Sequence, residues 1–283
     1  MTAATEVGTV RLGLIGDNIA RSQSPRLHEL AGRLVGIPVS YERLIPKDLG
    51  QDFEAVFAGA RLAGFRGLNV TYPYKERVVG LVRVPDPQVA ALGAVNTVLF
   101  TPQGPEGYNT DWSGFIAGYR HALGDRAPGP VCRVGAGGVG KAVAFGLLAL
   151  GLDDLTIVER DLPKAEALAE ALRDTAPGLK VRVTGNVAEG TAGVAGLINC
   201  TPVGMVGYDG TPVPRALMQG AAWAFDAVYT PVETEFLTDA AAEGLRVMSG
   251  WELYFYQGQH AFEIFHGRPI HEDRLRKALT ESA

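Results

Sequence analysis

Residues 131–140 read VCRVGAGGVG and contain the strongest indication of the fold. Val131 to Val134 is a short, mostly apolar run, typical of a buried strand in a parallel sheet. Gly135 to Gly140 matches the pattern G-x-G-x-x-G, and a helix-favouring run starts at Lys141. A strand, a glycine-rich turn and a helix in this order are typical of the first βα unit of a doubly wound α/β fold. We therefore predict a Rossmann-type sheet that begins at Val131.

An acidic residue supports this interpretation. Glu159 follows Gly135 by 24 positions and ends the next predicted strand. In this arrangement the glycines let a pyrophosphate approach the helix N-terminus, and the acid accepts hydrogen bonds from the adenosine ribose. Glycines alone also form ordinary structural turns, so the order of elements carries the prediction. The expected cofactor residues are Gly135, Ala136, Gly137, Gly138, Val139, Gly140 and Glu159.

The charges around Glu159 indicate which dinucleotide is used. A carboxylate at this position repels the 2′-phosphate of NADP. Arg160 acts the other way, since a guanidinium can hold that phosphate or stack on adenine. Asp161 adds a second negative charge. Two acids against one base favour NAD, with NADP as the alternative.

Short apolar runs and helical patterns continue on both sides of this stretch. In the later part we expect strands at 154–158, 180–183, 196–199 and 223–226, and helices at 138–150, 162–174 and from Trp251 to the end. In the earlier part we expect strands at 10–16 and 39–44, helices from Ser24-Pro25 and at 53–60, and a hairpin between 91–98 and 106–109. The loop Arg126–Pro130 separates the two parts. The chain is thus predicted to be a two-domain α/β protein.

The segment Gly67–Glu76 is a candidate ligand site. It is predicted to be a strand that turns into a helix at Pro73, with Asn69 and Thr71 on one face and Lys75 on the first helical turn. An amide, a hydroxyl and an ammonium group so placed can bind a polyhydroxylated ligand.

Composition excludes several classes of function. Of the 283 residues, 47% are apolar and 20% are charged, as in ordinary globular proteins. The net charge of -5 argues against binding to nucleic acid or to an anionic membrane surface. No apolar run reaches transmembrane length, and Met1 to Val10 lacks the features of a signal peptide, so a cytoplasmic location is expected.

The cysteines and histidines give no sign of a metal site. Cys132 and Cys200 lie in apolar runs, and we interpret them as reduced core thiols. The histidines do not cluster with metal-ligand spacing, so no metal is expected.

Several motifs, in order along nearly the whole chain, resemble the shikimate/quinate dehydrogenase family. They are Ser22-Gln23-Ser24-Pro25, Asn69 to Lys75, Gly93 to Thr97, Asn109-Thr110-Asp111, Gly135 to Gly140, Asn199 to Met205, Asp226 to Tyr229, and Gln257. This resemblance implies a substrate domain built from residues 1–111 and 251–283, a dinucleotide-binding domain at 112–250, and a cleft between them. It also implies interconversion of a ring hydroxyl and a ketone on shikimate or quinate, and it is compatible with a homodimer.

The resemblance also implies roles for individual residues. Lys75 and Asp111 would form the catalytic pair. The residues that would bind the hydroxylated ring carboxylate are Ser22 and Ser24 at the carboxylate, Asn69, Asn96, Asp111 and Gln257 at ring hydroxyls, and Thr71 and Tyr229 close by. Further cofactor contacts would come from Arg160, Thr201, Pro202, Gly204, Met205, Gly250 and Leu253.

The chemistry of alcohol oxidation agrees with a lysine at this site. The hydroxyl proton has to leave as hydride departs, and a lysine within hydrogen-bond reach can accept that proton once it has lost its own. We therefore expect oxidation to speed up as the pH rises from 7 to 10, whereas a flat profile would count against this role.

Simpler structural roles remain open for three residues. Ser24 and Asp111 are good helix N-caps, and Tyr229 is a plausible core residue. Ser22 has no such structural role.

The chain departs from the family pattern at Leu253, where methionine is usual, and at Tyr256, where a small residue is common. Substrate choice among quinate, shikimate and an amino-substituted analogue therefore stays open. Tyr72-Pro73-Tyr74 is similar to the quinate-using branch, and Glu159 points to the same NAD-linked branch, an NADP-dependent biosynthetic shikimate dehydrogenase being the alternative. A ligand-sensing protein without catalysis is a further alternative, but it would have no use for the proton acceptor Lys75.

Overall fold

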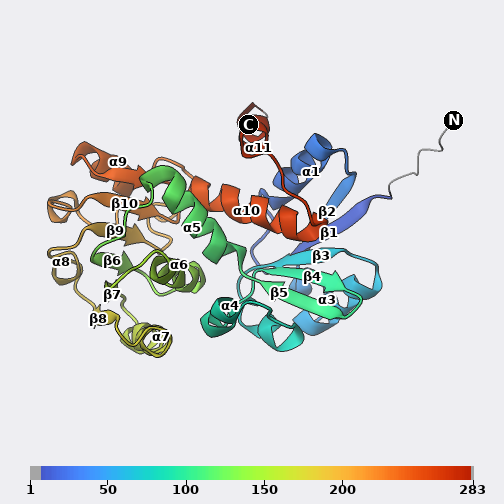
Figure 1. The fold of residues 1–283 in the computed structure, drawn as a ribbon, viewed down its shortest axis with the longest axis horizontal. Coiled ribbons are helices and arrows are strands. Elements are labelled where there is room, and N and C mark those ends of the chain that lie inside the picture. Colours follow the sequence, from blue (N-terminus) through green and yellow to red (C-terminus); the bar gives the residue numbers. More distant parts are fainter. Residues whose placement is uncertain (1–7, 282–283) are drawn as a thin grey trace. The chain divides into compact units, whose positions relative to one another are not determined.

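The computed structural model describes residues 8–281. The chain divides into two compact units (Figure 1). The first contains the chain up to Thr110 and again from Gly258 onward, and the second runs from Asp111 to Gln257. The expectation for Met1 to Val10 concerns residues that lie mainly outside the described range. Within that range, no helix combines the length and apolar character needed to cross a membrane.

The first unit is built on a mixed sheet. Within the described residues its strands are β1 Val10–Ile15, β2 Val39–Leu44, β3 Gly67–Val70, β4 Thr97–Thr101 and β5 Gly104–Tyr108, in the order β2-β1-β3-β4-β5. Strands β1, β2 and β3 are parallel. The predicted antiparallel hairpin is present as β4 and β5, but it begins at Thr97 rather than in residues 91–96.

Short helices connect these strands. They are α1 Ser24–Val35, α2 Pro46–Leu49, α3 Phe53–Leu62, the 3-10 helix Arg77–Leu81 and α4 Pro87–Leu92, and α11 Glu272–Glu281 closes the chain. Two longer helices, α5 Thr110–Leu123 and α10 Gly250–His266, carry the chain from one unit to the other. The C-terminal half of α10 packs on the first sheet, where Ala261 and Phe265 join a buried cluster with Leu12, Leu14 and Tyr41.

The second unit has the strand order of a Rossmann fold. Its strands are β6 Val131–Val134, β7 Asp154–Val158, β8 Lys180–Thr184, β9 Gly196–Asn199, β10 Trp223–Asp226 and β11 Arg246–Met248. They are parallel and lie in the order β8-β7-β6-β9-β10-β11, the order 3-2-1-4-5-6 of doubly wound dinucleotide-binding sheets. The predicted fold class is confirmed.

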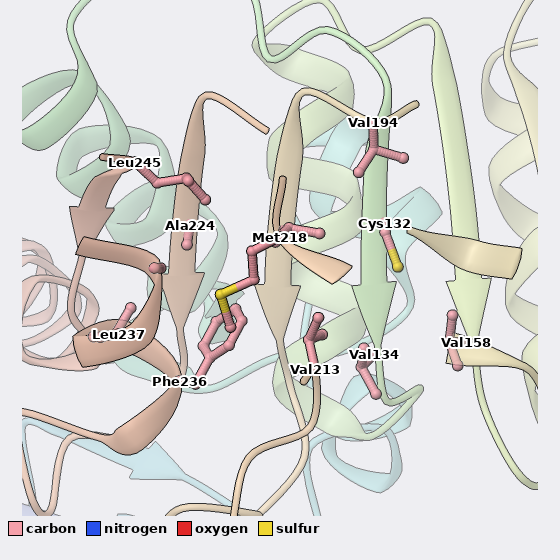
Figure 2. Packing of buried hydrophobic residues seen from close by; sticks show 12 residues of the cluster. Cys132, Val134, Val158, Val194, Val213, Met218, Ala224, Phe236, Leu237 and Leu245 are labelled. Atoms are coloured by element: carbon pink, nitrogen blue, oxygen red, sulfur yellow. The ribbon is translucent and has the colours of Figure 1, made fainter. Parts of the chain in front are cut away.

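Helices pack on both faces of this sheet. Helices α6 Gly138–Ala149 and α7 Leu162–Thr175 pack together, and α8 Val187–Gly190, the 3-10 helix Arg215–Leu217 and α9 Glu235–Ala242 complete the unit. Figure 2 shows the buried cluster formed with α9, which extends from Cys132 and Val134 of β6 to Phe236 and Leu237 of α9. Because side chains alternate along a strand, Arg133, between Cys132 and Val134, points to the opposite face of the sheet.

The structure corrects two local predictions and adds two elements. The helix expected at Pro73 is absent: Thr71 to Glu76 form turns, and only the 3-10 helix Arg77–Leu81 follows. Two adjacent valines and a glycine in Arg77–Leu81 favour an α-helix poorly. Cys200 lies just beyond β9 rather than inside it, and is half-buried. Helix α9 and strand β11 were not predicted.

Candidate functional site

Lys75 lies in a turn that neighbouring strands hold in place. The Thr71 N–H donates to the Ile15 carbonyl at 3.0 Å, and the Val95 N–H donates to the Lys75 carbonyl at 2.8 Å. These bonds tie the turn to the end of β1 and to the segment before β4. The Tyr74 side chain stacks on Phe53 with ring centroids 4.5 Å apart. The lysine is thus carried on a firmly fixed backbone, although not on the helix that the sequence suggested.

Asn69 is held by a network of buried polar groups. It lies in β3, and its side-chain oxygen accepts a 2.8 Å hydrogen bond from the Tyr41 hydroxyl. Its amide nitrogen donates to the Thr97 hydroxyl at 3.0 Å and to the Asn96 carbonyl at 3.3 Å. Three bonds to two segments, β2 and residues 96–97, fix the orientation of this side chain.

Asn96 joins the same network. Its side-chain oxygen accepts from the Thr110 N–H at 2.7 Å, from the Thr110 hydroxyl at 3.1 Å and from the Thr97 hydroxyl at 3.0 Å. The oxygen therefore faces the start of α5, where the predicted catalytic residue Asp111 follows. Asn96 precedes β4 rather than lying inside a strand, and it is buried.

Ser22 and Ser24 lie together at the start of α1. The Ser22 hydroxyl donates to the Ser24 hydroxyl at 3.1 Å. Gln23, not Ser24, occupies the N-cap position, and Ser24 is the first helical residue. The interpretation of Ser24 as N-cap is wrong, because the helical backbone already begins at Gln23.

The glycine loop packs against the loop after β9. Gly135 has a φ of 95°, in the left-handed region, and a Cβ there would lie 2.8 Å from the Thr201 methyl and 2.9 Å from the Cys200 carbonyl carbon. A side chain at this position would collide, so glycine is required. The structure thus brings together two predicted cofactor segments at the carboxyl ends of β6 and β9, where the strand order reverses.

The outer side of the loop suits a dinucleotide. Gly137 is the N-cap of α6 and its helix has no side-chain cap, so the first N–H groups are available to an anion. A Cβ on Gly137 would meet nothing within 4 Å, which leaves room for a phosphate to approach. The residues therefore fit the pyrophosphate of NAD or NADP.

Glu159 follows β7 and is bound to the glycine loop. The Ala136 N–H donates to its carboxylate at 2.7 Å, and the N–H groups of Arg160 and Asp161 donate at 2.8 and 3.3 Å. Partial burial alone would raise the pKa of the carboxyl, but these backbone bonds outweigh burial and the pKa is lowered. The side chain is therefore an anion at neutral pH. Arg160 beside it is exposed.

The Thr201 loop is shaped by Asn199. The side-chain oxygen of Asn199 accepts from the Thr201 N–H at 2.9 Å and from its hydroxyl at 2.7 Å. Gly204, with a φ of 93°, donates to the Tyr208 carbonyl, and Met205 after it is exposed. Pro202 is exposed as well.

A buried carboxylate, Asp226, organises the neighbouring loop. It accepts from the Asn199 amide and the Val228 N–H at 2.9 Å each and from the Thr234 hydroxyl at 2.6 Å. Burial raises the pKa of Asp226 to about 6, although these hydrogen bonds oppose the shift. The loop that Asp226 fixes carries Tyr229.

Tyr229 is not a core residue. It is partly exposed and stacks on Tyr254, with ring centroids 5.4 Å apart. A Cβ on Gly250 would collide with the carbonyl oxygens of Val228 and Ala227, so α10 starts directly against the backbone of this loop.

The remaining predicted residues lie along α10 and α5. Leu253 and Tyr256 are buried, and Tyr256 packs edge-on against Phe255 and His121. Gln257 donates to the Tyr254 carbonyl at 3.0 Å. Asp111 is buried in the first turn of α5, one residue inside the helix, so its alternative role as an N-cap is wrong.

Lys75 and Asp111 belong to different units, so their pairing stays a prediction. The sequence reasoning missed Tyr41, Thr110 and Asp17, whose side chains complete the polar networks of the first unit. An aromatic residue in a predicted strand was the available signal for Tyr41, which is the one buried residue of β2. Among residues 8–281, no group of three or more His, Cys, Asp or Glu side chains could hold a metal ion.

Comparisons with known proteins agree with this geometry. The family model for the shikimate dehydrogenase substrate binding domain matches residues 14–98. A quinate/shikimate dehydrogenase (NAD(+)) of Corynebacterium efficiens is 37% identical over 277 residues, which are 95% of this chain and 96% of the relative. A shikimate dehydrogenase (NADP(+)) of Haloarcula marismortui is 41% identical over 271 residues, 95% of this chain and 98% of the relative.

A solved structure shows the same similarity. Quinate dehydrogenase from Corynebacterium glutamicum in complex with NAD superposes with a TM-score of 0.91 at 34% sequence identity, covering 96% of this chain and 99% of that one.

Proposed function

The chain belongs to the shikimate/quinate dehydrogenase family, and on that premise we propose that it oxidises a ring hydroxyl of quinate or shikimate with NAD. It is an NAD(P)-dependent oxidoreductase that acts on hydroxylated ring substrates. The proposal adds the preference for NAD, the substrate and the roles of the side chains. The observation that carries the NAD preference is the ionised Glu159 carboxylate bound to the glycine loop.

The cofactor supplies the hydride acceptor when it is bound. The side chain of Lys75 takes the proton of the reacting hydroxyl as its carbon loses hydride, so that the alcohol becomes a ketone. Asp111 pairs with Lys75 and keeps it oriented. For the reverse reaction the same lysine returns the proton.

The polar networks hold the substrate. Asn69 and Asn96 offer amide groups whose orientation is fixed by Tyr41, Thr97 and Thr110. Because their geometry exists before binding, little side-chain entropy is lost when ring hydroxyls bind.

Other predicted residues bind the ends of the ligands. The paired hydroxyls of Ser22 and Ser24 suit the ring carboxylate. Thr71, Tyr229 and Gln257 complete the substrate contacts. Thr201 to Met205, Gly250 and Leu253 are proposed to contact the cofactor, as is Arg160 at the adenosine end.

The test is a comparison of four reactions. NADH or NADPH formation is measured with purified protein, quinate or shikimate, and NAD or NADP, at several pH values. The proposal predicts a faster reaction with NAD for at least one of the two acids. Absence of turnover in all four combinations would contradict it, and turnover only with an amino-substituted ring acid would correct the substrate.

NADP use is the second candidate, and two observations favour it: exposed Arg160 next to Glu159, and relatives named as NADP(+) enzymes. If Arg160 dominates, Glu159→Ala leaves an existing NADP activity intact instead of creating it. A cytoplasmic location and a homodimer are parts of the proposal, and analytical ultracentrifugation of the purified chain tests the dimer.

A further inference from the structure

Arg133 is a fully buried arginine in the middle of β6, the strand that leads into the glycine loop. Its exposed fraction is 0%, and it heads the fully buried side chains in size. Within the part of the chain that the structure describes, none of its three guanidinium nitrogens has a hydrogen-bond partner. Such donors are almost always paired in protein interiors. An exception of this kind requires an explanation.

The unpaired guanidinium is unfavourable for the fold itself. An arginine side chain stays charged in proteins, and a buried charge without a partner strongly destabilises the folded state. A methionine or leucine would suit a central strand of a buried parallel sheet better. The position therefore carries a cost that folding alone does not explain.

The side chain lies directly behind the glycine loop. Cys132 and Val134 point into the cluster of Figure 2, so Arg133 points to the face covered by α6. A Cβ on Gly140 would collide with the Nη1 atom of Arg133. The same Cβ would lie 3.0 Å from the Gly135 carbonyl oxygen. The guanidinium thus fills the space between β6 and the first turn of α6. Gly140 leaves room for the arginine.

Among the described residues, no anion is hydrogen-bonded to this guanidinium. Burial lowers the pKa of Arg133; a contact with the Cys200 thiol and the charge of Glu159 oppose that shift but do not cancel it. Burial raises the pKa of both thiols to about 12, so both are neutral. The Glu159 carboxylate is directed to the Ala136, Arg160 and Asp161 N–H groups instead.

The missing negative charge is one that the ligand would supply. The N-terminus of α6 already carries a partial positive charge and has no side-chain cap. We propose that Arg133 is a positioning residue for the dinucleotide, whose charge behind the glycine loop attracts the pyrophosphate through the loop backbone. This inference rests on the proposed binding of NAD at this loop. In return, the bound pyrophosphate offsets the buried charge.

The test compares ligands with and without a pyrophosphate. Dissociation constants for NAD, ADP-ribose and adenosine are measured on the wild type, Arg133→Met, Arg133→Lys and Arg173→Met. Arg173 is an exposed arginine of α7 and controls for loss of one positive charge in the same unit. The unfolding temperature of each protein is recorded without ligand.

We expect Arg133→Met to raise the dissociation constants for NAD and ADP-ribose by about tenfold or more. The dissociation constant for adenosine should stay within about twofold of the wild-type value. The ligand-free unfolding temperature of Arg133→Met should equal or exceed that of the wild type, because an unpaired buried charge is gone. Arg133→Lys should keep most of the affinity, and Arg173→Met all of it. If Arg133→Met does not fold, Arg133→Gln takes its place.

Two results would overturn the inference. One is equal affinity of wild type and Arg133→Met for ADP-ribose. The other is a loss of affinity for adenosine as large as that for ADP-ribose, which would indicate a structural role only. Failure of the wild type to bind NAD and ADP-ribose would instead reject the proposed function, and the inference with it.

Discussion

The Ala136 N–H donates a 2.7 Å hydrogen bond to the Glu159 carboxylate, which joins the acid after β7 to the glycine loop. Two further backbone N–H groups hold the same carboxylate. The negative charge thus has a fixed place next to the loop that is proposed to receive the pyrophosphate. A ribose with free hydroxyls suits this place, and a 2′-phosphate does not.

Glu159→Ala should therefore shift cofactor choice. Loss of hydrogen bonds to a charged acceptor, each contributing about 1.5–3 kcal/mol, should lower kcat/KM for NAD by about tenfold or more. Activity with NADP should rise because the repulsion is removed. Steady-state rates with both cofactors measure this, and Arg160→Ala is the companion variant that should reduce NADP use. An unchanged NAD preference in Glu159→Ala would rule out its role in selection.

Tyr41→Phe should weaken substrate binding. The change removes the 2.8 Å bond to the Asn69 oxygen and leaves the Asn69 bond to Thr97 in place. Since one such bond contributes about 1 kcal/mol, we expect KM for the ring acid to rise about fivefold while KM for NAD stays the same.

Tyr108→Phe is the matched control, because that hydroxyl donates to Glu106, which is not among the predicted site residues. Equal effects of both changes on KM would show that Tyr41 does not orient Asn69.

Tyr74→Phe should slow the reaction by loosening the turn before Lys75. The Tyr74 hydroxyl donates to Asp17 at 2.6 Å. That bond, followed by burial, raises the pKa of Tyr74 to about 12, so the hydroxyl stays a donor at every working pH. Its loss should cost about 1.5–3 kcal/mol of stability and lower kcat more than it raises KM. Urea unfolding together with kinetics measures both, and a stability loss with unchanged kcat would separate the turn from catalysis.

Asp226→Asn should change how stability depends on pH. The carboxyl has its ordinary pKa of 3.8 in the unfolded chain and a pKa of about 6 when folded, with burial as the main cause. Between these values the folded state binds more protons, so wild-type stability falls as the pH rises through this window. The amide does not titrate. Between pH 4 and pH 7, the free energy of unfolding of the variant should therefore rise relative to that of the wild type by up to about 3 kcal/mol.

Urea unfolding at both pH values provides the measurement. Asp125→Asn, at a side chain that is 94% exposed, is the control and should show no such gain. A constant difference between Asp226→Asn and wild type would mean that Asp226 titrates normally.

The sequence was sufficient where the determinants are local. Short apolar runs predicted β6, β7, β9 and β10, and the glycine pattern with Glu159 predicted the Rossmann-type sheet. Strand β11 was not predicted because it has only three residues, of which only Met248 is buried.

Prediction failed where distant contacts decide the structure. The Pro73 signal suggested a helix, but the backbone groups of Thr71 and Lys75 bond to Ile15 and Val95, far away in the sequence. The bonds from Tyr41 to Asn69 and the burial of Arg133 depend on tertiary packing in the same way. Local patterns contain no information on such partners.

The role of Lys75 as proton acceptor is tested by the turnover of Lys75→Met with saturating NAD and saturating quinate or shikimate. If Lys75 accepts the hydroxyl proton, kcat should fall by about 10²–10⁴-fold, with the dissociation constant for NAD unchanged. Arg77→Met, at an exposed side chain two positions further on that pairs with Glu54, is the control and should keep most of the activity. A Lys75→Met enzyme that retains more than about a tenth of wild-type kcat would contradict the account.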